Sequence, residues 1–293
     1  MTDARELTLA LGGRWHRSYG AAPCPICQPE RRKGQNALTL ADGNKGLVLH
    51  CKKTACSFTD ILGAAGIAPG DYRAHDPSEN ARRQAEARAE AERKARQALG
   101  VWREAKPIGG TVAETYLRGR GVTCSLPETL RFHPECFHGA TAKRFPAMVA
   151  LVEGAEGFAV HRTYLAADGT GKAPVDPPKA MLGAVAGGAV RFAEAQGLLV
   201  VAEGIETALS LSCGLLRTPA MIWAALSASG MRGLRLPDPP GRLTIAPDGD
   251  TAGREAAHAL AERAHALGWA VSLLPAPEGA DWNDVLTGKA VLA

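Results

Sequence analysis

Five acidic residues follow short apolar runs in the last third of the sequence, at points where buried strands would end. They are Glu203 after LLVVA (198–202), Asp248 and Asp250 after RLTIA (242–246), and Asp281 and Asp284 after AVSLL (270–274). Open α/β sheets bind ligands at the carboxyl ends of their strands, so these acids are expected at one edge of a sheet. Carboxylates gathered there repel one another unless cations lie between them, and oxygen ligands favour Mg²⁺ or Mn²⁺ over zinc. Such a site suits phosphoryl chemistry.

Four of the seven cysteines form a second pattern near the start of the chain. Cys24 and Cys27 flank two residues, and Cys51 and Cys56 flank four. Zinc takes four soft ligands in a tetrahedron, and each short pair supplies two of them. The intervening segment predicts two strands around a turn at 42–44, which brings the pairs together. We predict a zinc ribbon that gains folding energy from its metal. His50 is an alternative to one thiolate, and unrelated buried thiols are the competing interpretation.

Basic residues surround the cysteine pairs. They are Arg31, Arg32, Lys33, Lys45, Lys52 and Lys53. This distribution suits a ribbon that faces nucleic acid, and an ordinary charged surface is the alternative. The formal charge is +4 for residues 1–73, +3 for 74–197 and −3 for 198–293. A basic front can bind phosphates while an acidic back holds cations.

Length and composition indicate a globular chain of about two domains. It has 293 residues, of which 46% are hydrophobic and 22% charged, and this composition excludes wholesale disorder. No apolar run approaches the roughly 20 residues that span a bilayer, and the first 14 residues contain no signal-peptide core. We therefore expect a cytoplasmic protein without a membrane partner, whose cysteines bind metal rather than form disulfides.

Composition predicts four segments along the chain. They are a zinc-binding ribbon (1–73), a helical linker (74–106), an α+β basic region (107–197) and a parallel α/β domain (198–293). An Ala/Glu/Arg-rich stretch over 78–105 predicts one long solvated helix. Its charges nearly cancel, so a spacer is favoured over a nucleic-acid-binding arm. Short apolar runs between Gly- and Asp-containing turns predict hairpins in the basic region, and strands alternate with helices beyond Leu198.

Other cysteine and histidine residues form no complete metal motif. His133, Cys136 and His138 lie close together in the sequence, but a fourth ligand does not accompany them. Structural zinc sites use four protein ligands, so we favour roles in packing for these residues. Cys124 and Cys213 receive the same interpretation.

The acidic residues belong to three motifs whose order is informative. EGIETA occupies 203–208, DGDTAG 248–253 and DWND 281–284. At strand ends and in this order, the motifs resemble the toprim domain of topoisomerases and primases. With the cysteine ribbon in front, nearly the whole chain resembles the toprim primases of bacteriophages, plasmids and integrative elements, and more distantly the bacterial replicative primase. The resemblance implies an α/β fold with an N-terminal zinc ribbon, a helical linker, an α+β basic middle region and a Rossmann-like toprim catalytic sheet.

The resemblance also implies residue roles. Glu203 corresponds to the toprim glutamate, the general base or acid for a 3′-hydroxyl, and it is also a magnesium ligand. Asp248 and Asp250 correspond to the metal-binding pair, so these three residues are the predicted catalytic and magnesium-binding set. Asp281 resembles the start of the third acidic motif, and with Asp284 it is predicted to help bind the metal-bound nucleotide.

The motifs depart from the family pattern in two places. Asn283 stands where the replicative enzyme tends to have a carboxylate, and Asp284 is the candidate that compensates for it. Thr207 lies near the position of an additional family aspartate, and Glu206 is the alternative carboxylate there. The structure must decide whether either substitute reaches the metal.

Two basic residues in the middle region resemble primase residues that face nucleotide and template. Arg162 lies in the pair His161-Arg162, and Lys179 opens the sequence KAML after Pro178. We predict that Arg162 and Lys179 contact triphosphate or template. A solvated lysine beside a proline turn is the alternative.

The resulting hypothesis is a DNA primase of a phage or mobile element, which makes short primers on a single-stranded DNA template. It would use Zn²⁺ in the ribbon, Mg²⁺ or Mn²⁺ in the catalytic domain, nucleoside triphosphates as substrates and a separate replicative helicase as partner. Two alternatives stay open. A toprim nuclease would use the same acids to cleave phosphodiesters, and a non-catalytic replication module would only bind DNA.

Overall fold

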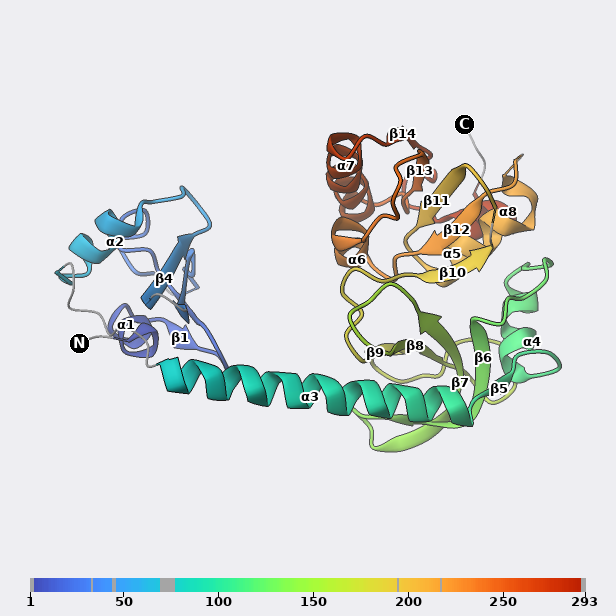
Figure 1. Cartoon of the computed structure of the whole chain (residues 1–293), viewed down its shortest axis with the longest axis horizontal. Helices are drawn as coiled ribbons and strands as arrows, with labels where there is room; N and C mark the ends of the chain where they lie inside the picture. Colours follow the sequence, from blue (N-terminus) through green and yellow to red (C-terminus); the bar gives the residue numbers. More distant parts are fainter. Residues whose placement is uncertain are drawn as a thin grey trace. The chain divides into compact units, whose positions relative to one another are not determined.

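The chain is described from a computed structural model and divides into two compact units, Met1–Arg88 and Ala89–Ala293 (Figure 1). The structure describes residues 3–32, 34–43, 46–68, 77–193, 195–216 and 218–290. Lys33, Lys45, the end of the predicted turn at 42–44 and the predicted boundary after residue 73 lie outside the described residues. The other predicted segment boundaries stay predictions.

The first unit contains a four-stranded antiparallel sheet and two short helices that share one core with it. The elements are α1 (Ala4–Ala10), β1 (Arg14–Trp15), β2 (Gly20–Ala22), β3 (Leu38–Gly43), β4 (Gly46–Cys51) and α2 (Phe58–Ala64). The sheet order is β1-β2-β3-β4, and Leu38 pairs with Cys51. Asp3 and Ser57 cap the two helices, because each side chain accepts a hydrogen bond from a backbone N–H in the first turn. The strands predicted between the cysteine pairs are confirmed as β3 and β4.

A long helix, α3 (Pro77–Glu104), agrees closely with the helix predicted over 78–105. Its last turns are not a free spacer. Ala98 is buried with Val149 and Val160 of a sheet in the second unit, and Val101 and Trp102 pack against the same cluster. The prediction of a solvated helix was therefore wrong for this end, where an ALGVW sequence places apolar side chains among the charges.

The second unit contains two five-stranded sheets. The antiparallel sheet has the order β5-β6-β7-β8-β9 and is accompanied by α4 (Val112–Gly119). Its strands are β5 (Lys106–Pro107), β6 (Leu130–His138), β7 (Lys143–Val152), β8 (Ala159–Tyr164) and β9 (Lys179–Leu182). One face of β7 and β8 packs on the end of α3, and the other contributes Met148 and Ala150 to a core shared with the second sheet.

The second sheet is parallel except for one edge strand, as strands alternating with helices predicted. Its order is β10-β12-β11-β13-β14, with β10 antiparallel to β12. The strands are β10 (Val190–Ala193), β11 (Leu198–Ala202), β12 (Met221–Ala224), β13 (Arg242–Ala246) and β14 (Ala270–Leu273). The helices are α5 (Ile205–Ser210), continued by the π-turn η1 (Leu211–Leu215), then α6 (Ala228–Gly233), α7 (Thr251–Ala266) and α8 (Trp282–Leu286).

Strand alternation distributes the helices over both faces of this sheet. Leu199 and Val201 of β11 belong to the core that includes the buried residues of α6 and α7. Val200 and Ala202 point to the opposite face, into the core that includes α5, α8 and the antiparallel sheet. Figure 1 shows α7 and α8 on opposite sides of the strands. The predicted α/β fold class is confirmed.

No helix among the described residues is both long enough and apolar enough to cross a lipid bilayer.

Candidate functional site

The four predicted cysteines converge in the first unit. All four sulfur atoms, from Cys24, Cys27, Cys51 and Cys56, lie within 4.8 Å of one another, and those of Cys27 and Cys51 are 3.5 Å apart. A tetrahedral zinc ion with Zn–S bonds of about 2.3 Å separates its sulfur ligands by about 3.8 Å, so the cluster fits zinc. His50 is exposed and lies outside this group. The chain therefore has a four-cysteine, zinc-ribbon-like site.

The loops around the cysteines are built to hold thiolates. Burial by itself raises the pKa of Cys51, but backbone N–H groups of Thr54, Cys56 and Lys53 outweigh it and lower this pKa to about 5. Burial raises the pKa of Cys24 to about 12, so a metal must displace its proton.

The predicted carboxylates gather at the carboxyl ends of the parallel strands. Glu203 follows β11 and Asp248 lies beyond β13, and these strands are neighbours in which Ala202 pairs with Ala246. Asp250 caps α7 by accepting a hydrogen bond from the N–H of Gly253 at 2.7 Å. Asp281 caps α8, and its Oδ1 accepts two backbone N–H groups at 2.8 Å. Each cap occupies one carboxylate oxygen and fixes the direction of the other.

The Asp-Gly-Asp loop is fixed against the segment before α8. Gly249 donates its N–H to the carbonyl of Ala280 at 2.8 Å and accepts from the N–H of Gly279 at 3.0 Å. A Cβ atom at position 249 would collide with the carbonyl oxygen of Pro277, so glycine is required there. This docking brings Asp248 close to Asp281.

The strand-end acids raise one another's pKa values. Burial raises the pKa of Asp248 to about 7, with further contributions from Glu203 and Asp281. Burial also raises the pKa of Glu203, with help from Asp250, and Glu203 Oε2 is buried without a hydrogen-bond partner. The arrangement disfavours negative charge unless a cation joins it.

The chemistry of these oxygen donors, one of them an unpartnered buried oxygen of Glu203, fits Mg²⁺ or Mn²⁺. Within the part of the chain that the structure describes, the cysteines are the one group of three or more potential ligands gathered tightly around a point. The carboxylates are more open. Mg²⁺ commonly takes only one or two carboxylates and completes its octahedron with water and substrate phosphates, so an open set suits it.

Two residues of the third acidic motif, Asn283 and Asp284, make hydrogen bonds that stabilise the local fold. Asn283 is buried, and its Nδ2 donates to the carbonyl of Arg120 at 2.7 Å and to Ser210 Oγ at 3.0 Å. Asp284 accepts from the N–H of Asp281 at 3.3 Å, which closes the capping box of α8. The amide at 283 therefore anchors α8, while Asp281 is the member of the motif that acts on Asp248.

Glu206 is buried away from the other acids and is paired with cations. Its carboxylate accepts from Tyr116 Oη at 2.8 Å and from Lys179 Nζ at 3.2 Å, and Lys172 Nζ lies 3.7 Å away. Burial opposes its charge, but Lys179 and Lys172 outweigh this effect and lower the pKa of Glu206. The neighbouring Thr207 donates its hydroxyl to Asp248 Oδ1 at 3.2 Å. Glu206 does not supply the additional acid of the motif, and Thr207 contacts Asp248 in that place.

The structure separates the two predicted basic residues. Thr163 of β8 pairs with Lys179 of β9, so these two side chains share one face of the antiparallel sheet. Arg162 projects from the other face, where its guanidinium donates to the carbonyls of Phe137 at 3.2 Å and Met181 at 3.3 Å. Lys179 lies near the strand-end acids, whereas Arg162 is on the side opposite to it. Lys172 and Tyr116 were missed because neither forms a local motif.

The remaining candidate ligands have protein partners. His138 hydrogen-bonds through its ring nitrogens to Thr141 and to the carbonyl of Pro177, and His133 Nε2 lies 3.2 Å from Glu104. Cys213 Sγ accepts the backbone N–H of Cys124 at 3.3 Å.

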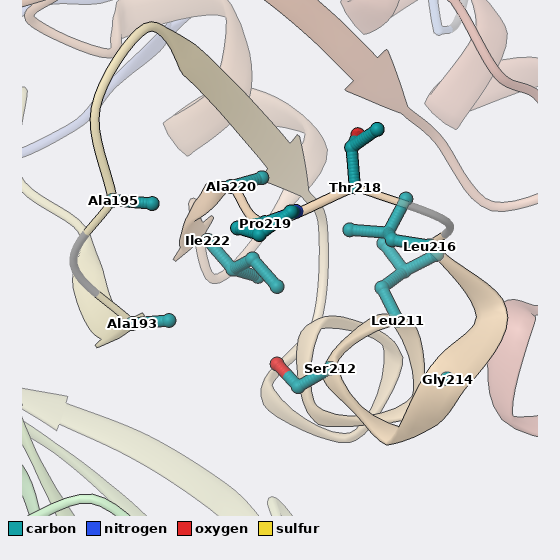
Figure 2. Close-up of a pocket in the computed structure, with 10 residues that line it drawn as sticks. All are labelled: Ala193, Ala195, Leu211, Ser212, Gly214, Leu216, Thr218, Pro219, Ala220 and Ile222. Carbon is teal, nitrogen blue, oxygen red and sulfur yellow. The ribbon is translucent and has the colours of Figure 1, made fainter.

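Two cavities deserve comparison with this site. The first has a volume of about 400 Å³ and lies beside η1 and β12, and Figure 2 shows mainly small and apolar side chains around it. It contains none of the strand-end acids. The second, of about 380 Å³, lies on the first unit, where His16 stacks on Tyr19 at 4.8 Å next to Lys52 and Lys53.

The segment that forms the parallel sheet matches a known domain family. Residues 198–290 match the family model of the Toprim domain. This region is a toprim domain. Residues 92–192 match a domain of unknown function (DUF7146). No curated protein is significantly similar in sequence to the chain.

Several solved primase structures are distantly similar to the chain. A DNA primase domain from Pseudomonas aeruginosa is 18% identical over 67% of this chain and 75% of its own, with a TM-score of 0.41. The zinc-binding and RNA polymerase domains of the Aquifex aeolicus primase are 14% identical over 98% and 83%, with a TM-score of 0.43. The primase fragment of the bacteriophage T7 primase-helicase is 12% identical over 92% and 94%, with a TM-score of 0.39.

The toprim loop gives a first prediction. Gly249→Ala should destabilise the protein by about 1–3 kcal/mol, because the added methyl group displaces the loop from Pro277. Urea denaturation measures this change. Gly139→Ala is the matched control, since a Cβ there meets nothing within 4 Å. Equal stabilities for the two variants would contradict the docking of this loop.

The cysteine cluster gives a second prediction. Wild-type protein should contain one tightly bound zinc ion per chain, and Cys27→Ser should lose it, since a structural site needs four ligands. Zinc content by elemental analysis and thermal unfolding measure the effect. Cys124→Ser, which lies outside the cluster, should keep its zinc. Full zinc occupancy in Cys27→Ser would exclude this site.

The toprim acids give a third prediction. The pKa of Asp248 is raised from 3.8 to about 7, so the folded state loses stability as pH rises between these values. Without added Mg²⁺, Asp248→Asn should therefore melt above wild type at pH 8, and the difference should shrink toward pH 5. Added Mg²⁺ should raise the melting temperature of wild type and leave Asp248→Asn unchanged. An equal response of both proteins to Mg²⁺ would remove Asp248 from the metal site.

Proposed function

We propose that the chain is a DNA primase that joins nucleoside triphosphates on a single-stranded DNA template. The observation that carries the proposal is the set of interacting carboxylates at the strand ends of a toprim domain, with lysines on the adjacent sheet. Several carboxylates that raise one another's pKa suit metal-assisted transfer between phosphates, because metal ions offset their repulsion and stabilise the attacking and leaving oxygens.

In this proposal Asp248 and Asp250 hold Mg²⁺ or Mn²⁺, with Asp281 beside them. The metal supplies charge stabilisation for the attacking and leaving oxygens of the phosphoryl transfer. Glu203 takes the proton of the 3′-hydroxyl, and its raised pKa and unpartnered Oε2 suit a proton acceptor. The 3′-oxygen then bonds to the α-phosphorus, and the bond to pyrophosphate breaks. Lys179 contacts the triphosphate in its ground state and during transfer.

The ribbon is proposed to bind zinc and to contact template. His16 and Tyr19 present an exposed stacked pair, and Lys52 and Lys53 line the same cavity. Aromatic faces stack on unpaired bases while ammonium groups contact phosphates, and this combination suits single strands. Arg31 and Arg32 are also exposed on this unit.

The biological setting is part of the same proposal. We infer that the enzyme makes primers for a phage or another mobile element, works with a separate replicative helicase and acts in the cytoplasm where that DNA is copied. The two alternatives are a nuclease, which would cleave DNA with the same acids, and a non-catalytic module, which would only bind DNA. One assay can separate these two from the primase.

The proposal is tested by incorporation of labelled nucleotides on single-stranded DNA with Mg²⁺ or Mn²⁺. Short products should require template, metal and both Asp248 and Asp250. Asp248→Ala and Asp250→Ala should each lose more than the roughly 10–100-fold that loss of an outer-shell metal partner costs. Glu262→Ala, on the exposed face of α7, is the matched control.

Three outcomes would contradict the proposal. Template degradation that needs metal but no nucleotide would identify a nuclease. Template binding without synthesis or cleavage would identify a binding module. Undiminished synthesis by both aspartate variants would place the chemistry elsewhere in the chain.

A further inference from the structure

The buried carboxylate of Glu206, three residues after Glu203 in the sequence, has no part in the mechanism above. The side chain of Glu206 is only 5% exposed, yet its two ammonium partners, Lys172 and Lys179, are 32% and 37% exposed. Each lysine therefore turns one side toward Glu206 and keeps another open to solvent. An ammonium group has three donors, so both lysines have capacity to bind a second anion.

The partners of Glu206 come from separate parts of the fold. Tyr116 lies on α4, Lys172 in the loop between β8 and β9, and Lys179 at the start of β9, whereas Glu206 is in the first turn of α5 of the toprim domain. Tyr116 is nearly fully buried and directs its hydroxyl to Oε1. The hydrogen bond from Tyr116 therefore holds the carboxylate of Glu206 in place independently of the two lysine side chains.

Like charges would otherwise separate the two lysines. Burial is the largest effect that lowers the pKa of Lys172, and Lys179 and Arg120 lower it further, so three cations lie within electrostatic range of one another. Glu206 offsets one of these charges and leaves an excess of positive charge next to the strand-end acids. Lys179 is also close enough to lower the pKa of Glu203 against the dominant effect of burial. The pair is therefore suited to a polyanion that also reaches the metal site.

We infer that Glu206 is a positioning residue that holds Lys172 and Lys179 together as a two-ammonium site for the phosphates of the incoming nucleotide. The inference rests on the proposed function for the identity of this ligand. Because Glu206 is set before binding, the two lysines lose less conformational freedom when the phosphates arrive. Thr207 extends the same turn of α5 to Asp248, so one turn orients both the lysines and a metal-binding acid.

The test compares Glu206→Gln with Glu255→Gln, which removes the carboxylate of an exposed ion pair with Arg232. Equilibrium binding of fluorescently labelled ATP with Mg²⁺ is measured on the full chain, together with thermal unfolding. Loss of one charge-assisted positioning contact should raise the Kd of Glu206→Gln by about tenfold, and Glu255→Gln should bind as wild type. In primer synthesis, the KM for nucleotide should rise more than kcat falls, whereas a merely structural defect reduces the active fraction and kcat.

Lys172→Met covers the case in which Glu206→Gln does not fold. It should also raise the Kd, since it removes one of the two ammonium groups. A folded Glu206→Gln with unchanged Kd, or Lys172→Met with unchanged Kd, would overturn the inference. Synthesis by wild type with either of these results would leave the proposed reaction intact. If ATP binding depends on Glu206 and Lys172 but no primer is made, the proposed reaction is contradicted and the phosphate site is supported.

Discussion

Repulsion among carboxylates at the strand ends is the constraint on which the second unit depends. Glu203, Asp248, Asp250 and Asp281 come from neighbouring strand ends of one sheet, and burial makes negative charge on Glu203 and Asp248 expensive. The fold satisfies the nearby Glu206 with lysines and a tyrosine from the antiparallel sheet and α4. It offers Glu203 and Asp248 no comparable ion pair within the described residues. Glu206 is thus fully paired within the protein, whereas the strand-end acids Glu203 and Asp248 keep unbalanced negative charge.

The same side chains build the site and hold it in place. Asp250 and Asp281 cap α7 and α8, so each acid is fixed by the helix that it starts, and the positive end of the helix favours its charge. Gly249, between Asp248 and Asp250, permits this loop to approach Pro277. The first unit solves a different problem with a different chemistry, since its small core gains support from four convergent cysteines.

The sequence was sufficient to predict those features that depend on residues close together in the chain. Apolar runs followed by acids located the parallel strands and the edge at which the acids gather, and paired cysteines located the ribbon site. Contacts across long sequence separations could not be predicted in this way. Tyr116 and Glu206 are 90 residues apart, and nothing in either local sequence indicates the hydrogen bond between them. The faces of Arg162 and Lys179 depend on the register of β8 and β9, which a single sequence does not specify. Asn283 looked like a degenerate metal ligand because burial, which decides its role, is a property of the folded chain.

Anomalous scattering from Mn²⁺ can locate the cation that we propose at the toprim edge. Crystals grown with Mn²⁺ and a nucleoside triphosphate would be measured at wavelengths on either side of the manganese absorption edge. We expect an anomalous peak within about 2.0–2.3 Å of oxygen atoms of Asp248 or Asp250, with the triphosphate completing the coordination. A bound nucleotide whose Mn²⁺ lies away from both aspartates, or fully occupied Mn²⁺ at Glu206, would contradict this proposal.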